Sequence, residues 1–263
     1  KLLRLIRSKT KAEENEAEKL GLLLKGAKVC EEKLEDNSRA WSWFKEIFSR
    51  ISVDDDVMSV LEEAAHRMEQ FGDLAVMYED LAPRAEDPER KVMRWRQAAQ
   101  LYSEKVGDHE RALYDIYQAV LADPDDVTLL DAADTAALMC KDWERLGAIY
   151  EKISRGLDDV GGRVMLMRRF ADVVWRKGDF AQGAVMPLLR ATDEMPDDEE
   201  LFEEFHEAAL QAGEYRELLG AFEKRFRATD DKEKRLEIKL RMARIMAEHL
   251  ENVDGAIKII QEA

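Results

Sequence analysis

The sequence predicts an all-α protein that folds as an α-solenoid of about seven antiparallel helix hairpins. Residues that favour helices, chiefly Ala, Leu, Glu, Arg, Lys and Met, recur throughout the 263 residues. Alternating runs of β-branched and polar residues are scarce, so strands are not expected. The composition, 46% hydrophobic and 37% charged, is typical of an ordered protein. In addition, the sequence matches itself when it is shifted by 72 residues.

Small residues mark this repeat. In one series, two sets of alanines stay in register without gaps: Ala27, Ala99, Ala171 and Ala243, and Ala40, Ala112, Ala184 and Ala256. In a second series, alanine pairs precede an aromatic residue: Ala64 and Ala65 with Phe71, Ala136 and Ala137 with Trp143, and Ala208 and Ala209 with Tyr215. Small side chains allow two helices to cross closely. The unit of 72 residues is therefore predicted to be two hairpins of about 36 residues each.

The predicted elements follow in order along the chain. Leu2 and Ile6 are in register with Leu74 and Tyr78, so residues 1–12 are expected to be the end of a preceding repeat. Seven hairpins then follow, near residues 13–52, 55–84, 88–122, 126–156, 159–194, 198–228 and 231–263. Their first helices are expected to begin near residues 13, 55, 88, 126, 159, 198 and 231, and their second helices near residues 37, 71, 108, 142, 179, 214 and 252. Residues 1–263 would form a single solenoid that is a piece of a longer array.

Acidic residues precede several of these helices, and one helix contains a proline. The stretches 54–56, 125–126, 197–198 and 230–231 each precede a first helix, where an N-cap and the helix dipole favour negative charge by about 0.3–1 kcal/mol. Much of the net charge is therefore helix capping. Pro187 lies inside a second helix and removes one backbone hydrogen bond to Gly183. We expect a kink near residues 183–187, because a straight helix with a central proline costs roughly 3 kcal/mol.

The stretch 94–126 resembles the tetratricopeptide repeat (TPR) family. It reads Trp95-x2-Ala98-Ala99-x2-Tyr102, followed by Ala112-x3-Ile116, Ala119 and Pro124. Residues 167–196 match this pattern more loosely, and Lys239 stands at the tryptophan position of the last copy. The second series has a shorter interval after its alanine pair and is also similar to half-a-TPR (HAT) hairpins. The resemblance implies a right-handed solenoid whose first helices line a concave binding groove.

The same resemblance implies which residues would bind a partner in that groove. The candidates on the first helices are Lys25, Lys28, Arg96, Gln100, Arg168, Arg169, Arg241 and Arg244. Acidic residues occupy matching positions of the second series: Glu62, Glu63, Asp134 and Glu207. Two interpretations stay open at this point. Neighbouring first helices could pair these charges with one another, at roughly 0–1 kcal/mol per exposed pair, or the arginines could be available for an acidic peptide or protein.

Trp43 is a further candidate. It aligns with Asp115 and Pro187 at a position expected to face outward, whereas Trp41 aligns with apolar residues and is expected in the core. An exposed tryptophan would be a contact anchor, and packing against a neighbouring loop is the alternative.

Composition and motifs exclude several classes of function. The chain has 41 Lys and Arg against 57 Asp and Glu, and its net charge of −16 disfavours direct nucleic-acid binding. No apolar run approaches the roughly 20 residues of a membrane span. Cys30 and Cys140 occupy apolar helical positions, which suits small core residues in a reducing compartment. No motif indicates catalysis, a metal or a cofactor, and the four histidines are expected to be exposed or structural.

We therefore expect a non-enzymatic, cytoplasmic scaffold that docks a protein or peptide. Bacterial arrays similar to this one recruit polarity, motility or secretion components, sometimes through a small GTPase. Two alternatives stay open: a self-assembling structural module, using hairpin ends or the apolar residues around Trp43, and an RNA-processing scaffold of the HAT type. The oligomeric state is left open.

Overall fold

The computed structural model describes residues 1–51 and 53–261, and every regular element in these ranges is helical. Residue 52 and residues 262–263, at the expected ends of the first and last hairpins, lie outside the described residues. The chain divides into two compact units, Lys1–Asp123 and Pro124–Ala263, and each is described by itself. The single solenoid over residues 1–263 stays a prediction.

Unit 1 holds one helix and three hairpins. Its elements are α1 (Leu2–Ala12), α2 (Glu16–Lys28), the π-helical turn η1 (Val29–Lys33), α3 (Asn37–Arg50), α4 (Asp55–Met68), α5 (Phe71–Leu81), α6 (Pro88–Leu101), η2 (Tyr102–Val106) and α7 (His109–Ala122).

Unit 2 holds four hairpins in its described residues. Its elements are α8 (Leu129–Cys140), α9 (Trp143–Ser154), α10 (Val160–Ala171), η3 (Asp172–Lys177), α11 (Ala181–Glu194), α12 (Glu199–Ala212), α13 (Tyr215–Ala228), α14 (Lys232–His249) and α15 (Val253–Gln261).

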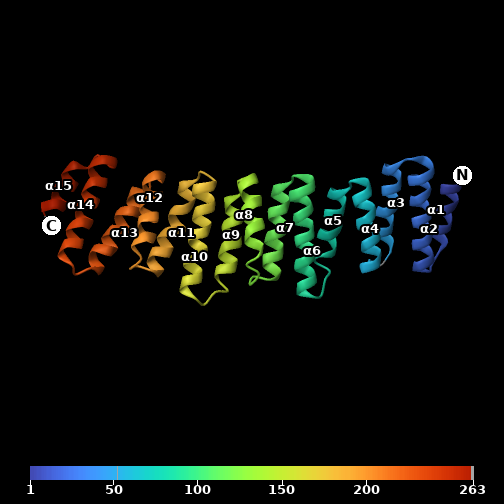
Figure 1. The fold of residues 1–263 in the computed structure, drawn as a ribbon, viewed down its shortest axis with the longest axis horizontal. Coiled ribbons are helices and arrows are strands. Elements are labelled where there is room, and N and C mark those ends of the chain that lie inside the picture. Colours follow the sequence, from blue (N-terminus) through green and yellow to red (C-terminus); the bar gives the residue numbers. More distant parts are fainter. Residues whose placement is uncertain (52, 262–263) are drawn as a thin grey trace. The chain divides into compact units, whose positions relative to one another are not determined.

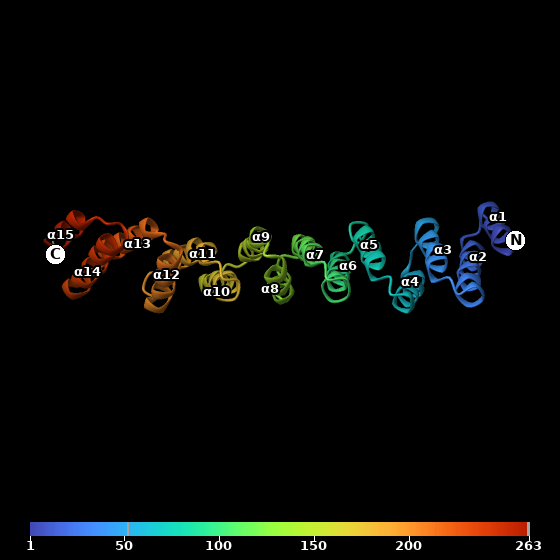
Figure 2. The same cartoon turned by 90° about the horizontal axis from the view of Figure 1, so that it is seen from above.

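Within each unit, consecutive helices pack side by side (Figure 1). In each unit taken by itself, the first helices of the hairpins lie in one row and the second helices in another (Figure 2). The chain is thus an all-α repeat of helix hairpins, as the sequence predicts. The alanines at the repeat positions lie between these helices, and all are buried. A larger side chain at these positions would separate two helices that now touch.

The turns between helices repeat with the same 72-residue period as the alanines. Residues with positive φ fall into two series: Glu35, Gly107, Asp179 and Glu251, and Glu69, Lys141 and Gly213. Each residue follows a first helix, where a left-handed residue reverses the chain and satisfies the last carbonyl groups. In the first series, the amide of the next residue donates to the carbonyl of Cys30, Tyr102, Val174 or Met246. The backbone conformation of the turn therefore repeats every 72 residues, even at positions that are not glycine.

Aspartate side chains start many of the helices. The carboxylates of Asp54, Asp198 and Asp231 accept hydrogen bonds from amides in the first turns of α4, α12 and α14. The stretch 125–126 behaves differently, because Asp126 accepts from the amide of Thr128 and caps a turn. For this reason α8 begins at Leu129, three residues after the expected start near residue 126. α11 continues through Pro187, and a kink there stays a prediction.

Candidate functional site

The eight candidate residues all lie on first helices, but they are divided between the two units. Lys25 and Lys28 lie on α2, Arg96 and Gln100 on α6, Arg168 and Arg169 on α10, and Arg241 and Arg244 on α14. Unit 1 therefore holds four of them and unit 2 the other four.

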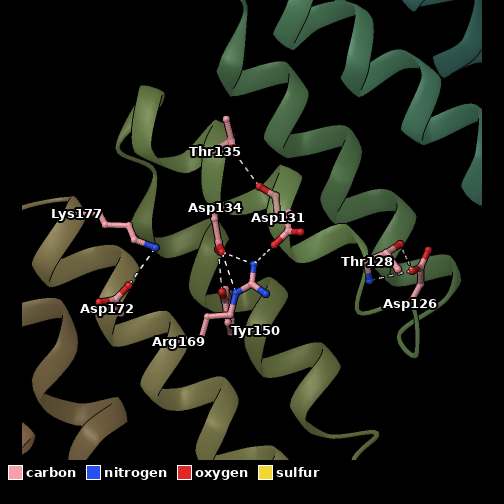
Figure 3. A network of polar contacts seen from close by, with 9 residues as sticks. All are labelled: Asp126, Thr128, Asp131, Asp134, Thr135, Tyr150, Arg169, Asp172 and Lys177. Atoms are coloured by element: carbon pink, nitrogen blue, oxygen red, sulfur yellow. Dashed lines mark hydrogen bonds and ion pairs between the residues drawn. The ribbon is translucent and has the colours of Figure 1, made fainter.

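Arg169 joins α10 to α8 through carboxylates (Figure 3). Its Nε and Nη2 lie 3.0 and 2.6 Å from the Oδ2 of Asp134, and Nη2 is 2.5 Å from the Oδ1 of Asp131. The hydroxyl of Tyr150 donates to the other oxygen of Asp134 over 2.8 Å. Burial lowers the pKa of Arg169, but its hydrogen bonds to the carboxylates outweigh burial and raise this pKa. The guanidinium is therefore held in a polar network and stays charged.

Two other arginines join first helices in the same way. Arg168 donates to both oxygens of Glu204 on α12, over 3.0 and 2.5 Å. Arg241 of α14 donates to Glu203 of α12 over 2.5 and 2.6 Å and lies 3.3 Å from the Nδ1 of His206. These bonds connect α8, α10, α12 and α14. Of the two interpretations, charge pairing between neighbouring first helices therefore holds for these three arginines.

The remaining candidates are more exposed. Lys28 forms an ion pair with Glu32 in its own helix at 3.6 Å, and Gln100 donates to Glu104 over 3.0 Å. Lys25, Arg96 and Arg244 are exposed on α2, α6 and α14.

The Arg169 network belongs to a three-residue pattern that the sequence analysis missed. A polar residue, an aromatic residue 16 positions later and a third residue 19 positions after it recur at the 72-residue shift. The three sets are Glu62, Tyr78 and Gln97; Asp134, Tyr150 and Arg169; and His206, Phe222 and Arg241. The three aromatic residues share the 72-residue register of the apolar positions, so their type alone does not indicate polar neighbours.

Members of each set are in contact. The Tyr78 hydroxyl donates to Glu62, as Tyr150 does to Asp134. In the third set, Arg241 lies over the Phe222 ring at 5.2 Å and beside the His206 imidazole. Burial, followed by the charge of the neighbouring carboxylate, raises the pKa of Tyr78 and of Tyr150. Both tyrosines are therefore neutral hydrogen-bond donors at physiological pH.

Each unit has a groove beside these sets. The unit 1 groove lies among α4, α5, α6 and η2, with a volume of about 680 Å³, and Glu62, Leu74, Tyr78, Gln97 and Leu101 contribute to its lining. The unit 2 groove lies among α10, η3, α11 and α12, with a volume of about 540 Å³, and is lined in part by Met165, Arg168, Asp172, Trp175 and Glu204. Both combine apolar side chains with charged ones, which suits a polypeptide ligand.

Trp43 is not an exposed anchor, because only 1% of its surface is accessible. Arg7 of α1 lies over its ring at 5.0 Å, and Gly26 of α2 packs so closely on Trp43 that a Cβ there would lie 2.6 Å from the indole. The aligned Asp115 is also fully buried. This position faces the preceding helices of the stack, so the expectation that it faces outward was wrong. Because Trp43 is buried, it offers no exposed surface through which two copies of the chain could associate.

Asp115 has unusual surroundings for a carboxyl group. Neither of its oxygens has a hydrogen-bond partner among the described residues. Burial, followed by the negative charge of Glu79, raises the pKa of Asp115 to about 8. Tyr102 and Arg111 lie close to Asp115 and Glu79. Arg111 donates a hydrogen bond to the Tyr102 hydroxyl over 2.7 Å, and this hydroxyl donates to Glu79 over 3.2 Å. Asp115 therefore carries a proton at neutral pH.

The cysteines and histidines form no shared site. Cys30 is a free, buried thiol whose pKa is raised by burial, whereas Cys140, expected in the core, is only half-buried at the end of α8. Among residues 1–51 and 53–261, no group of three or more His, Cys, Asp and Glu side chains is placed to hold a metal ion. Within the same described ranges, no helix combines the length and apolar character that crossing a membrane requires.

Solved structures include matches to this fold, whereas the comparisons with family models and curated proteins found none. A crystal structure of a tetratricopeptide repeat protein from Parabacteroides merdae aligns with 91% of this chain and 91% of its own, at 15% identity and a TM-score of 0.32.

Proposed function

We propose that this chain is a non-enzymatic, TPR-like scaffold that docks partner proteins along its first helices. The observation that carries this proposal is the pair of grooves, one in each unit, to which first and second helices contribute apolar and charged side chains. Rigid helices hold such a surface in place, so that little conformational entropy is lost when a polypeptide binds. The net charge of −16 favours a protein ligand over a nucleic acid.

The TPR resemblance of residues 94–126 supports the same proposal. It suggests a cytoplasmic setting and recruitment within a bacterial polarity, motility or secretion assembly. The ion pairs of Arg168, Arg169 and Arg241 refine the expected ligand of unit 2. Because these guanidinium groups already hold carboxylates, an acidic ligand would have to displace them. A ligand with apolar side chains, which would contact exposed residues such as Met165, needs no such exchange.

Site-specific photo-crosslinking tests the proposal. A benzoylphenylalanine at Met165 places the crosslinker on α10 in the unit 2 groove, where Met165 is 66% exposed. The matched control places it at Met186 on the second helix α11, where the methionine is 50% exposed. In a lysate of the source cells, a scaffold is expected to yield discrete protein adducts from position 165 and few from position 186. Identical products from both positions, or none from position 165, would contradict the proposal.

A further inference from the structure

The repeated three-residue pattern differs in one copy. In unit 2, Asp134 receives a hydroxyl from Tyr150 and the guanidinium of Arg169, so its charge is neutralised on α8. In the next copy the chain again supplies an arginine, Arg241, which pairs with Glu203. In that copy the polar residue is His206, and Arg241 lies 3.3 Å from its Nδ1. Two of the three copies therefore contain a guanidinium group of the chain, and only the copy of Asp134 pairs it with the carboxylate of the set.

In unit 1 the corresponding arginine is replaced by Gln97. Glu62 still receives the hydroxyl of Tyr78, but no ion pair of Glu62 or of Glu63 occurs in the described part of the chain. The Oε1 of Gln97 is buried and has no hydrogen-bond donor in the same ranges. A carboxylate and an amide oxygen thus stand where the second copy has a carboxylate and its cation. A half-buried carboxylate without a cation has an unfavourable desolvation free energy, so this site favours a cationic group of a ligand.

The space for such a group exists. Glu62, Tyr78 and Gln97 all line the unit 1 groove, whose volume is about 680 Å³. The basic side chains in and beside this groove have other contacts. The His66 ring packs edge-on against the Phe71 ring at 5.3 Å between ring centres, and Arg94, whose charge also acts on Tyr78, donates to the carbonyl of Leu81 over 2.8 Å. Arg67 pairs with Glu31 at 3.1 Å, and the ammonium group of Lys105 lies 5.7 Å from the centre of the Phe71 ring.

We propose that the unit 1 groove binds an arginine side chain of a partner protein beside Glu62, Tyr78 and Gln97. The guest guanidinium takes the place that Arg169 takes beside Asp134 and Tyr150. Arginine fits better than lysine, because its planar fork can donate to a carboxylate and an amide oxygen together, whereas an ammonium group acts as a point charge. Leu74 and Leu101 in the lining favour apolar residues next to this arginine. This inference rests on the proposed scaffold function and names its partner chemistry.

Peptide binding to the whole chain tests the proposal. The probe is a capped tripeptide with arginine between two leucines, and its control is the same peptide with citrulline, which keeps the shape but loses the charge. Binding is followed by chemical-shift changes in the protein's NMR spectrum. We expect the arginine peptide to shift resonances of α4, α5 and α6 and to bind at least about tenfold more tightly than the citrulline peptide.

Variants separate this site from general attraction to an acidic protein. Gln97→Arg should fill the site with the chain's own guanidinium and weaken peptide binding about tenfold or more, and Glu62→Gln should weaken it similarly. Ala132→Arg adds the same charge at an exposed residue of α8 in unit 2 and should leave binding unchanged. Equal binding of both peptides, shifts outside unit 1, or equal loss in the Gln97→Arg and Ala132→Arg variants would overturn the proposal.

The crosslinking experiment keeps the two proposals distinct, because it probes the unit 2 groove. Adducts at position 165 together with no preference for the arginine peptide would leave the scaffold function standing and reject the arginine site. Binding of the arginine peptide with no adduct at position 165 would contradict the proposed docking along the first helices of both units and leave the arginine site of unit 1 standing.

Discussion

The substitution Asp115→Asn is expected to change how the stability of this protein depends on pH. Asp115 is fully buried on α7 and neither of its oxygens is hydrogen-bonded within the described residues. Burial raises its pKa to about 8, from an ordinary value of 3.8 in the unfolded chain. The folded state therefore keeps a proton that the unfolded state releases as the pH rises from about 4 to about 8. The contribution of Asp115 to stability is highest below its unfolded pKa and falls as the pH rises through this window.

The size of the effect follows from one proton. Within the window, unfolding releases one proton per molecule from this group, so the free energy of unfolding falls by about 1.4 kcal/mol per pH unit. Between pH 5 and pH 7 the loss is roughly 3 kcal/mol. Asparagine has nearly the same shape and does not titrate, so the variant is expected to lack this loss and to be the more stable protein at pH 7.

Urea denaturation at pH 5, 6, 7 and 8, followed by far-UV circular dichroism, measures the difference between variant and wild type. Asp56→Asn, which removes an exposed carboxylate of α4 in the same unit, is the matched control and should run parallel to wild type. Parallel curves for Asp115→Asn and wild type would refute the reasoning. A carboxyl 13C titration of Asp115 with a midpoint below pH 5 would refute it directly.

Three further predictions concern backbone, packing and charge. Glu69 has a φ of 54°, so Glu69→Gly should raise the free energy of unfolding by about 1 kcal/mol, and an unchanged urea midpoint would contradict this. Gly26→Ala brings a Cβ to 2.6 Å from the Trp43 ring and should cost about 1–3 kcal/mol; a near-UV circular dichroism spectrum like that of wild type would argue against the packing described. Arg169→Gln leaves the carboxylate of Asp134 without its cation and should cost about 2 kcal/mol in thermal or urea unfolding, whereas a neutral effect would show that this ion pair does not stabilise the fold.

Much of the fold could be predicted from local sequence. Ala27 and its equivalents identify the helix crossings, because only small side chains permit close approach. The positive-φ residues keep the same 72-residue spacing, although Glu69 and Lys141 are not glycine, the residue type that usually indicates such a turn. Their conformation follows from where one helix must reverse into the next, which residue type alone does not indicate.

The candidate site was only partly predictable. Arg168 and Arg169 were identified as first-helix residues of interest, but their partners were not. The partner of Arg169 lies 35 residues earlier, and no local pattern connects the two. The significance of Gln97 is visible only when its surroundings are compared with those of Arg169 in the other unit.

By itself, the sequence determined the helical class, the 72-residue repeat and the residues between crossing helices, because helix propensity and the spacing of small side chains act over a few turns. The tertiary structure alone decided that Trp43 and Asp115 are buried, that Arg169 pairs with Asp134 and that Glu62 forms no ion pair among the described residues. These properties depend on how far each helix is rotated towards its neighbours in the stack. That rotation is set by packing between residues distant in the chain, where burial and charge pairing change steeply over a few ångströms.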